Sequence, residues 1–109
     1  VFCSTVNMSI ERAMALSPIS VYQEEEGLSL ILTESAARSA GFEIDGVFRC
    51  ITLTVHSSLN AVGLTAAVAT KLSSHNISAN VVAAFYHDHI YVPAAKAEQA
   101  LELLSELQK

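Results

Sequence analysis

The residues best suited to chemistry in this sequence lie in one short stretch, FYHDHIYV, in which two histidines flank an aspartate. In a strand, His87 and His89 would share a face and could provide two imidazole ligands for a metal ion. Two ligands are too few for structural zinc, and His56 is a remote third candidate. No nucleophile or second carboxylate accompanies Asp88, which argues against catalysis. The alternative is structural, with the three residues as the polar link of a hairpin directly after Tyr86.

A second candidate is the glycine at the expected start of a helix, Gly63, between Val62 and Leu64. Because glycine has no side chain, backbone N–H groups beside it can approach a ligand closely. A helix N-terminus also carries unsatisfied donors and a partial positive charge, which suit a carboxylate. The alternative is that Gly63 only permits close packing of the helix on a sheet.

The composition is that of a folded domain: 109 residues, 51% of them hydrophobic and 16% charged. The net charge of -5 predicts no binding to nucleic acid and no polybasic contact with a membrane surface. The two cysteines, Cys3 and Cys50, have no CxxC spacing. We expect both to be buried free thiols, which favours a reducing, cytoplasmic location.

The run from Cys50 to Thr70 contains no charged residue and superficially resembles a membrane span. Polar residues such as His56 and Asn60 interrupt it, and they would be costly in lipid. We therefore expect no membrane segment. The chain starts at Val1 with neither a basic region nor a methionine, so we expect no signal peptide and further residues upstream.

Alternating apolar and polar residues predict strands over residues 1–6, 19–24, 28–32, 51–55, 77–86 and 90–92. Apolar residues at helical spacing predict helices over residues 62–75 and 93–107. A shorter helix is expected to start at a Thr33 or Ser35 cap and to end at Gly41, and residues 7–17 are expected to hold a helical turn. The predicted buried stripe of the last helix consists of Ala97, Ala100, Leu101, Leu104 and Leu107.

The order strand, helix, strand, strand, helix fills the second half of the chain and recurs more weakly in the first. This order predicts an α+β fold in which an antiparallel sheet carries helices on one face. We expect two tandem βαββα units, an incomplete one over residues 1–46 and a second over residues 47–109. The other face of the sheet, which bears Thr52 and Thr54, is expected to be solvated or covered by a second copy.

Two stretches carry a resemblance to a known family. The run LTVHSSLNAVGLTAAVATKLSSHNISANVVAAFYHDHIYVP resembles an ACT domain, and QEEEGLSLILTESAARSAG upstream is similar to the first unit of small proteins with two tandem ACT-like units. The resemblance implies a ferredoxin-like fold in each unit. One departure is that Asn60-Ala61-Val62-Gly63 stands where ACT loops usually carry an acidic residue and Pro-Gly. The N-terminal helical stretch common in the family is also missing.

The resemblance further implies a non-enzymatic regulatory module that binds an amino acid. Carried over to this sequence, Asp88 would accept the ligand amine near the glycine loop and replace the acidic residue missing at Asn60. The ligand-binding residues implied in this way are Asn60, Ala61, Val62, Gly63, Leu64, Phe85, Tyr86, His87 and Asp88.

Three hypotheses follow for the function. The first is a sensing module for a free amino acid, without a cofactor or a bound metal. The second is an assembly module that pairs with a copy of itself and binds no ligand. The third is an enzyme or metal-binding protein that uses the histidines. In the first two cases we expect a homo-oligomer, because short strands leave two exposed sheet edges and ACT folds tend to associate.

Overall fold

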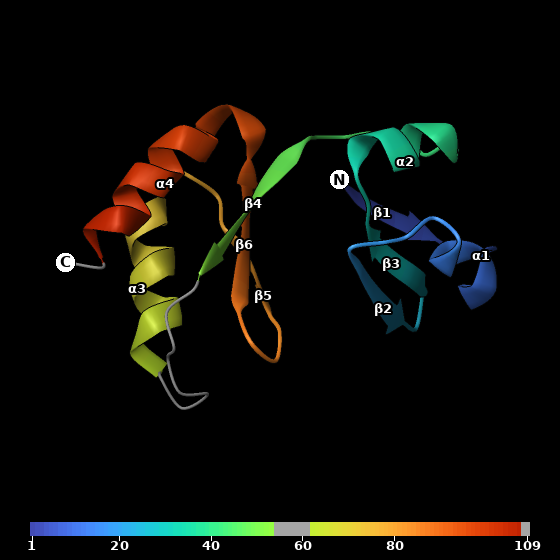
Figure 1. Ribbon diagram of the computed structural model, residues 1–109, viewed down its shortest axis with the longest axis horizontal. Coiled ribbons are helices and arrows are strands. Elements are labelled where there is room, and N and C mark those ends of the chain that lie inside the picture. The colour runs from blue at the N-terminus through green and yellow to red at the C-terminus, as the bar shows by residue number, and fades with distance from the viewer. Residues whose placement is uncertain (54–61, 108–109) are drawn as a thin grey trace. The chain divides into compact units, whose positions relative to one another are not determined.

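The computed structural model describes residues 1–53 and 62–107 and divides the chain into two units, Val1–Val47 and Phe48–Lys109 (Figure 1). Each unit has its own three-stranded sheet and its own hydrophobic core. The sequence predicted the division one residue earlier, between residues 46 and 47.

The first unit follows the order strand, helix, strand, strand, helix. Its elements are β1 (Phe2–Thr5), α1 (Ile10–Met14), β2 (Ser20–Glu24), β3 (Gly27–Ile31) and α2 (Glu34–Ser39). The strands pair antiparallel in the order β1-β3-β2, and both Cys3 and Val21 pair with Leu30 of the central strand. Both helices pack on this face of the sheet, because Ala13 of α1 and Ala37 of α2 are fully buried in the same core cluster.

Side-chain caps explain where the two short helices of the first unit begin. The Ser9 hydroxyl accepts a hydrogen bond from the Arg12 N–H at 3.2 Å, and the Thr33 hydroxyl accepts one from the Ala36 N–H at 3.2 Å. Each satisfies one of the donors that a helix N-terminus leaves unpaired. Of the two predicted caps for α2, Thr33 is therefore the one that acts. Gly41, with φ of 85°, follows the helix in the left-handed conformation expected of a C-terminal glycine.

The hairpin between β2 and β3 is tight. Glu24 pairs with Gly27, so only Glu25 and Glu26 lie between the paired positions. Gly27 has φ of 148°, and a Cβ at this position would collide with the Thr5 carbonyl of the neighbouring strand. The close approach of two backbones therefore requires glycine here.

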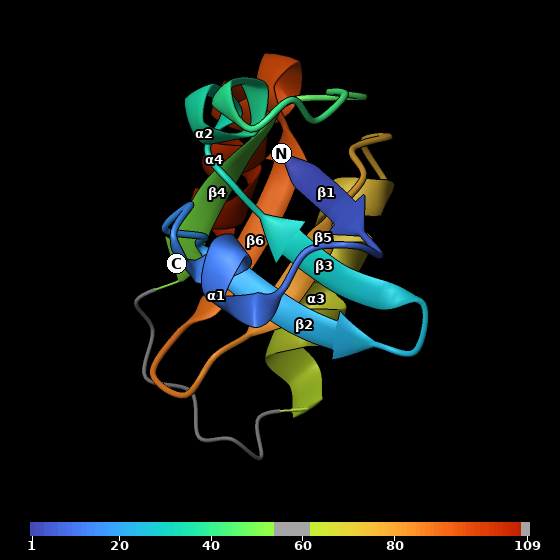
Figure 2. The same ribbon diagram turned by 90° about the vertical axis from the view of Figure 1, so that its right-hand side faces the viewer.

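The second unit repeats the order of the first with longer helices. Its elements are β4 (Phe48–Leu53), α3 (Val62–Ser73), β5 (Asn80–Ala83), β6 (Asp88–Pro93), a 3₁₀ turn η1 (Ala94–Lys96) and α4 (Ala97–Glu106). The strand order β4-β6-β5 is equivalent to that of the first unit. Helices α3 and α4 lie on one face of this sheet (Figure 1, Figure 2). The predicted α+β fold with tandem βαββα units is confirmed.

The core of the second unit corrects the predicted stripe of α4. Leu104 is buried as expected, but Leu103 is buried as well, whereas Leu101 is 55% and Leu107 39% exposed. The sequence ALELLSEL allows two helical phases, and the sheet residues decide between them. The buried side chains of the cluster, contributed by the sheet, both helices and the segment after α3, are Leu53, Val68, Leu72, Ile77, Ile90, Val92, Ala100, Leu103 and Leu104.

The strand predicted from Ile77 to Tyr86 is shorter in the structure. Asn76 takes a left-handed conformation with φ of 59°, and the Ile77 N–H donates to the Leu72 carbonyl at 3.0 Å. This closes the end of α3 in a Schellman-type motif, which keeps Ile77 packed under the helix instead of in the sheet. Strand β5 consequently starts only at Asn80.

The prediction that His87-Asp88-His89 links the hairpin is wrong. Asp88 pairs with Leu53 on one side and with Ala83 on the other, so it belongs to β6, as does His89. The link consists of residues 84–87, and the Ala84 N–H donates to the His87 carbonyl at 3.0 Å. The two polar residues Asp88 and His89 made the start of β6 look like part of the turn. Asp88 nevertheless continues the alternation of the strand, because it lies on the same face as the buried Ile90.

The cysteines differ from one another. Cys3 is 8% exposed in the core of the first unit, as predicted, and burial raises the pKa of its thiol. Cys50 is exposed, which corrects the prediction. Its cross-strand partner is Tyr91, and both lie on the face of the sheet opposite the core residue Leu53. The expectation based on the usual burial of cysteine fails because strand alternation decides the face.

The uncharged run that resembles a membrane span is divided between two elements. It starts in β4 and continues in α3, and its middle lies outside the described residues. Within the described part of the chain, no helix is both long and apolar enough to cross a membrane.

Candidate functional site

The first turn of α3 contains Gly63 and no acidic side chain. Gly63 is exposed, and a Cβ at this position would meet no heavy atom of residues 1–53 and 62–107 within 4 Å. Close packing of helix on sheet therefore does not explain this glycine within the described residues. The turn has no acidic residue, so no carboxylate of its own offsets the partial positive charge that a helix N-terminus presents to an anion.

Leu64 fixes where this turn lies. Its side chain is half-buried against the core of the second unit, which includes Leu53 and Ile90. The Leu64 side chain is thus part of the hydrophobic core, and only the Leu64 backbone can contact a ligand. The predicted site residues Asn60 and Ala61 lie outside the described residues.

Asp88 lies at the first position of β6, on the core side of the sheet. It pairs with Leu53, and cross-strand partners share a face, so its carboxylate is on the side that α3 and α4 cover. Asp88 is half-buried, and its carboxylate has no hydrogen-bond or ion-pair partner in the described part of the chain. A carboxylate without a protein partner can accept hydrogen bonds from a cationic group of a ligand beside it.

The start of α3 and the turn between β5 and β6 lie at the same end of the second unit (Figure 1, Figure 2). The arrangement follows from the fold, because β4 and β6 run antiparallel and Leu53, the last described residue of β4, pairs with the first residue of β6. Residues far apart in the sequence, Gly63 and Asp88, are thereby placed at one end of one unit.

The other predicted residues of the turn are not brought into the core. Phe85 and Tyr86 are 78% and 82% exposed, and their rings contact each other edge-to-face with centroids 4.9 Å apart. His87 is exposed too. These side chains are free to cover a ligand at this end of the unit, but the structure gives them no contact with Gly63.

His87 in the turn and His89 in β6 form no complete metal site with other described residues. The rings of His87 and His89 are 6.2 Å apart between centroids. No group of three metal-ligating side chains occurs among residues 1–53 and 62–107, and the third predicted candidate, His56, is outside these ranges.

Sequence reasoning missed a cluster on the opposite face of the same sheet. Thr52 Oγ1 lies 2.9 Å from His89 Nδ1, and Cys50 Sγ lies 3.9 Å from the same nitrogen. Tyr91 is 5% exposed beside them; burial, followed by its hydrogen bond with Cys50, raises its pKa to about 12. The alternation that places Cys50 and Thr52 opposite Leu53 was visible in the sequence, but their pairing with β6 required the strand register.

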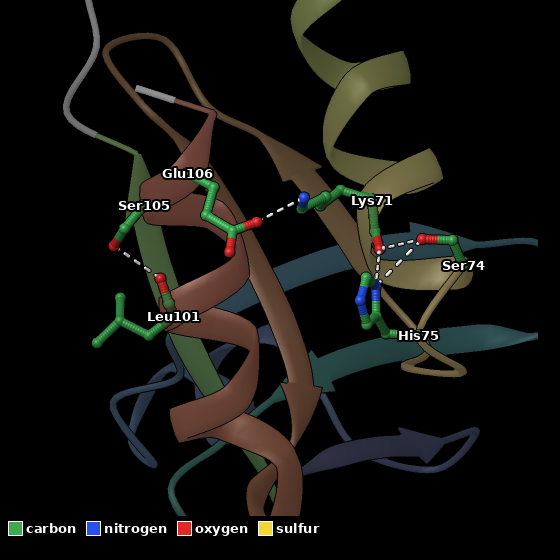
Figure 3. Close-up of polar contacts among 6 residues, drawn as sticks. All are labelled: Lys71, Ser74, His75, Leu101, Ser105 and Glu106. Atoms are coloured by element: carbon green, nitrogen blue, oxygen red, sulfur yellow. Dashed lines mark hydrogen bonds and ion pairs between the residues drawn. The ribbon is translucent and has the colours of Figure 1, made fainter. Parts of the chain in front are cut away.

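One ion pair joins α3 to α4, and local hydrogen bonds close the end of α3. Lys71 Nζ forms an ion pair with Glu106 Oε2 at 2.6 Å, and the Lys71 carbonyl accepts a hydrogen bond from the Ser74 hydroxyl at 2.8 Å (Figure 3). His75 Nδ1 lies 3.0 Å from the same carbonyl. These contacts cap the helix end and do not form a ligand site.

Comparisons with known proteins agree with this geometry. An ACT domain model matches residues 47–106, and a second ACT domain model matches residues 1–49. A Vibrio cholerae protein of unknown function, described as a possible transport protein, is 56% identical in sequence, with a TM-score of 0.90 over 95% of this chain and 79% of that one. An Agrobacterium tumefaciens protein, 22% identical, shares the fold with a TM-score of 0.67 over 80% of this chain and 64% of that one. No curated protein matches the sequence. The chain belongs to the ACT domain family.

Proposed function

We propose that this protein is a non-enzymatic regulatory module that binds a free amino acid between the start of α3 and the start of β6. ACT domains are typically regulatory domains for small ligands such as amino acids. The observation that carries the proposal is the half-buried carboxylate of Asp88, which has no partner within the described ranges and lies at the same end of the unit as Gly63.

The chemistry of the two ends of an amino acid matches the two parts of this site. Its carboxylate suits the backbone N–H groups at the start of α3, because a helix N-terminus carries a partial positive charge. Its ammonium group suits Asp88, because a charge-assisted hydrogen bond would compensate the half-buried charge. The exposed rings of Phe85 and Tyr86 can then pack on the ligand side chain.

We also propose a cellular location and an oligomeric state for the protein. The two cysteines are unpaired, and an exposed free thiol persists best in a reducing compartment, which supports a cytoplasmic location. The short edge strands β4 and β5 support a homo-oligomer, which would also bring a second copy near the ligand.

A thermal-shift panel tests the proposal. A ligand that binds the native state raises the melting temperature, so at least one free amino acid should stabilise the protein. Gly63→Val should abolish that shift, because a branched side chain would occupy the space where the ligand meets the backbone. The melting temperature of the free protein should change little, since the position is open among the described residues.

The alternatives give different results in the same panel. Stabilisation by divalent metals but by no amino acid would favour the histidine-based hypothesis. A melting temperature that changes only on dilution would favour a ligand-free assembly module. Either result would contradict the proposed function.

A further inference from the structure

A second group of reactive side chains lies on the face of the β4-β6-β5 sheet that is opposite the α3 and α4 core. The strand register pairs Cys50 with Tyr91 and Thr52 with His89, so all four side chains share this face. Sγ of Cys50 lies 3.8 Å from Thr52 Oγ1 and 3.9 Å from His89 Nδ1. The Thr52 hydroxyl is in turn 2.9 Å from the same imidazole nitrogen.

These neighbours suit a thiol that acts as a nucleophile. A thiol reacts as the thiolate, so it needs an acceptor for its proton and donors for the resulting charge. His89 Nδ1 is within reach of the thiol both directly and through the Thr52 hydroxyl. Tyr91 is the cross-strand partner of Cys50, and burial, followed by its interaction with Cys50, raises the pKa of the phenol to about 12, so it stays protonated. A protonated phenol can donate to the sulfur.

The same chain contains a thiol in the opposite environment. Cys3 is 8% exposed in the core of the first unit, whereas Cys50 is exposed. Burial raises the pKa of Cys3, which disfavours its thiolate. Access and chemistry therefore both favour reaction at Cys50.

We propose that Cys50 is a site of reversible modification by low-molecular-weight disulfides. In this step the Cys50 proton passes to His89, and the thiolate attacks one sulfur of the small disulfide. A new S–S bond to Cys50 forms, the S–S bond of the reagent breaks, and the second sulfur leaves as a thiolate that takes up the proton. An excess of the small thiol reverses the step, and no other oxidant is needed.

Oxidised glutathione is the probe that tests the proposal on the full chain. Intact mass spectrometry follows the addition of one glutathionyl group with time, and peptide mapping locates it. We expect modification at Cys50 and not at Cys3, no modification of Cys50→Ser, and complete reversal by reduced glutathione. Reaction of folded protein at Cys3 as fast as at Cys50 would overturn the proposal.

The role of His89 needs a variant and a matched control. His89→Gln should slow the modification by about tenfold or more, because the imidazole that accepts the proton is lost. His75→Gln, at an exposed histidine after α3, should leave the rate unchanged. Thr52→Val, which keeps the shape of the side chain, provides a second test if His89→Gln does not fold. Wild-type rates in folded His89→Gln and in Thr52→Val would overturn the proposal, as would a wild-type rate no faster than that of a cysteine in an unstructured peptide.

Discussion

The two units of this chain share one topology and use it differently. Both have a βαββα order, and in both sheets the last strand lies in the middle. The helix after the first strand, however, has 5 residues in the first unit and 12 in the second. In the first unit, the Ser9 hydroxyl occupies a donor at the start of α1. In the second, Gly63 and Leu64 begin the described part of α3 with no polar side chain.

The hairpins that precede the last helix of each unit also differ, in the length and the residue types of their links. In the first unit two residues link the paired positions, and the link is acidic. In the second unit four residues separate Ala83 from Asp88, and they include the exposed Phe85 and Tyr86. A wider turn leaves Asp88 as the first paired residue of β6, on the core side. The proposed ligand site therefore depends on one turn and one helix start that only the second unit has, and not on the shared topology.

Of the substitutions that would separate the two units, Gly27→Ala in the first unit is expected to lower the free energy of unfolding most. The new Cβ would collide with the Thr5 carbonyl, and φ of 148° strains any residue other than glycine. We expect the free energy of unfolding to fall by about 4 kcal/mol. Gly41→Ala is the matched control, because a Cβ there meets nothing within 4 Å and only the φ of 85° is strained. That variant should lose about 1 kcal/mol.

Urea unfolding followed by circular dichroism measures both variants of this pair. Amide hydrogen exchange separates the units, since Leu30 reports on β3 and Ile90 on β6. If the two glycine variants lost equal stability, close backbone approach would not be the reason for Gly27. If Ile90 lost as much protection as Leu30, the two units would not be energetically distinct.

A slightly smaller effect is expected in the core of the second unit. Leu104→Ala removes a side chain that is 5% exposed and should lower the free energy of unfolding by about 3 kcal/mol. Leu101→Ala, on the same helix but 55% exposed, should change it by less than about 0.5 kcal/mol. Denaturant titration of both variants checks the phase of α4. Equal losses would restore the stripe predicted from the sequence.

The smallest loss in the free energy of unfolding is expected when an ion pair is broken. Lys71→Gln breaks the pair with Glu106 that joins α3 to α4, and Arg38→Gln breaks the pair with Glu34 within α2. Because each pair has at least one largely exposed side chain, each variant should lose about 0.5 kcal/mol or less. Both losses should shrink in high salt, measured by urea unfolding at two ionic strengths. A salt-independent loss for Lys71→Gln alone would indicate that this residue contributes by packing instead.

Local patterns predicted most of the fold. The run Leu28–Leu32 alternates and follows a turn residue, and it forms β3 with only a small shift of its ends. Thr33 and Gly41 marked the ends of α2 because capping is a local interaction. The order of elements, and with it the tandem units, followed from such signals.

The errors arose where distant residues decide. The phase of α4 depends on which leucines meet Ile90 and Val92, and helical spacing alone allowed Leu101 as well as Leu103. The register of β6 against β4 makes Asp88 a strand residue and brings His89 to Thr52. A single sequence does not contain this register in any local pattern.

The proposed function depends most on Asp88, which would be the partner of the ligand ammonium group. The chain contains one other aspartate, the exposed Asp45 in the first unit, which provides a matched control. Calorimetry would compare Asp88→Asn with Asp45→Asn, using the amino acid that gives the largest thermal shift. We expect Asp88→Asn to bind roughly ten- to a hundredfold more weakly, because a charge-assisted hydrogen bond is lost, and Asp45→Asn to bind as the wild type does. Unchanged affinity of Asp88→Asn, with its fold intact by circular dichroism, would contradict the account.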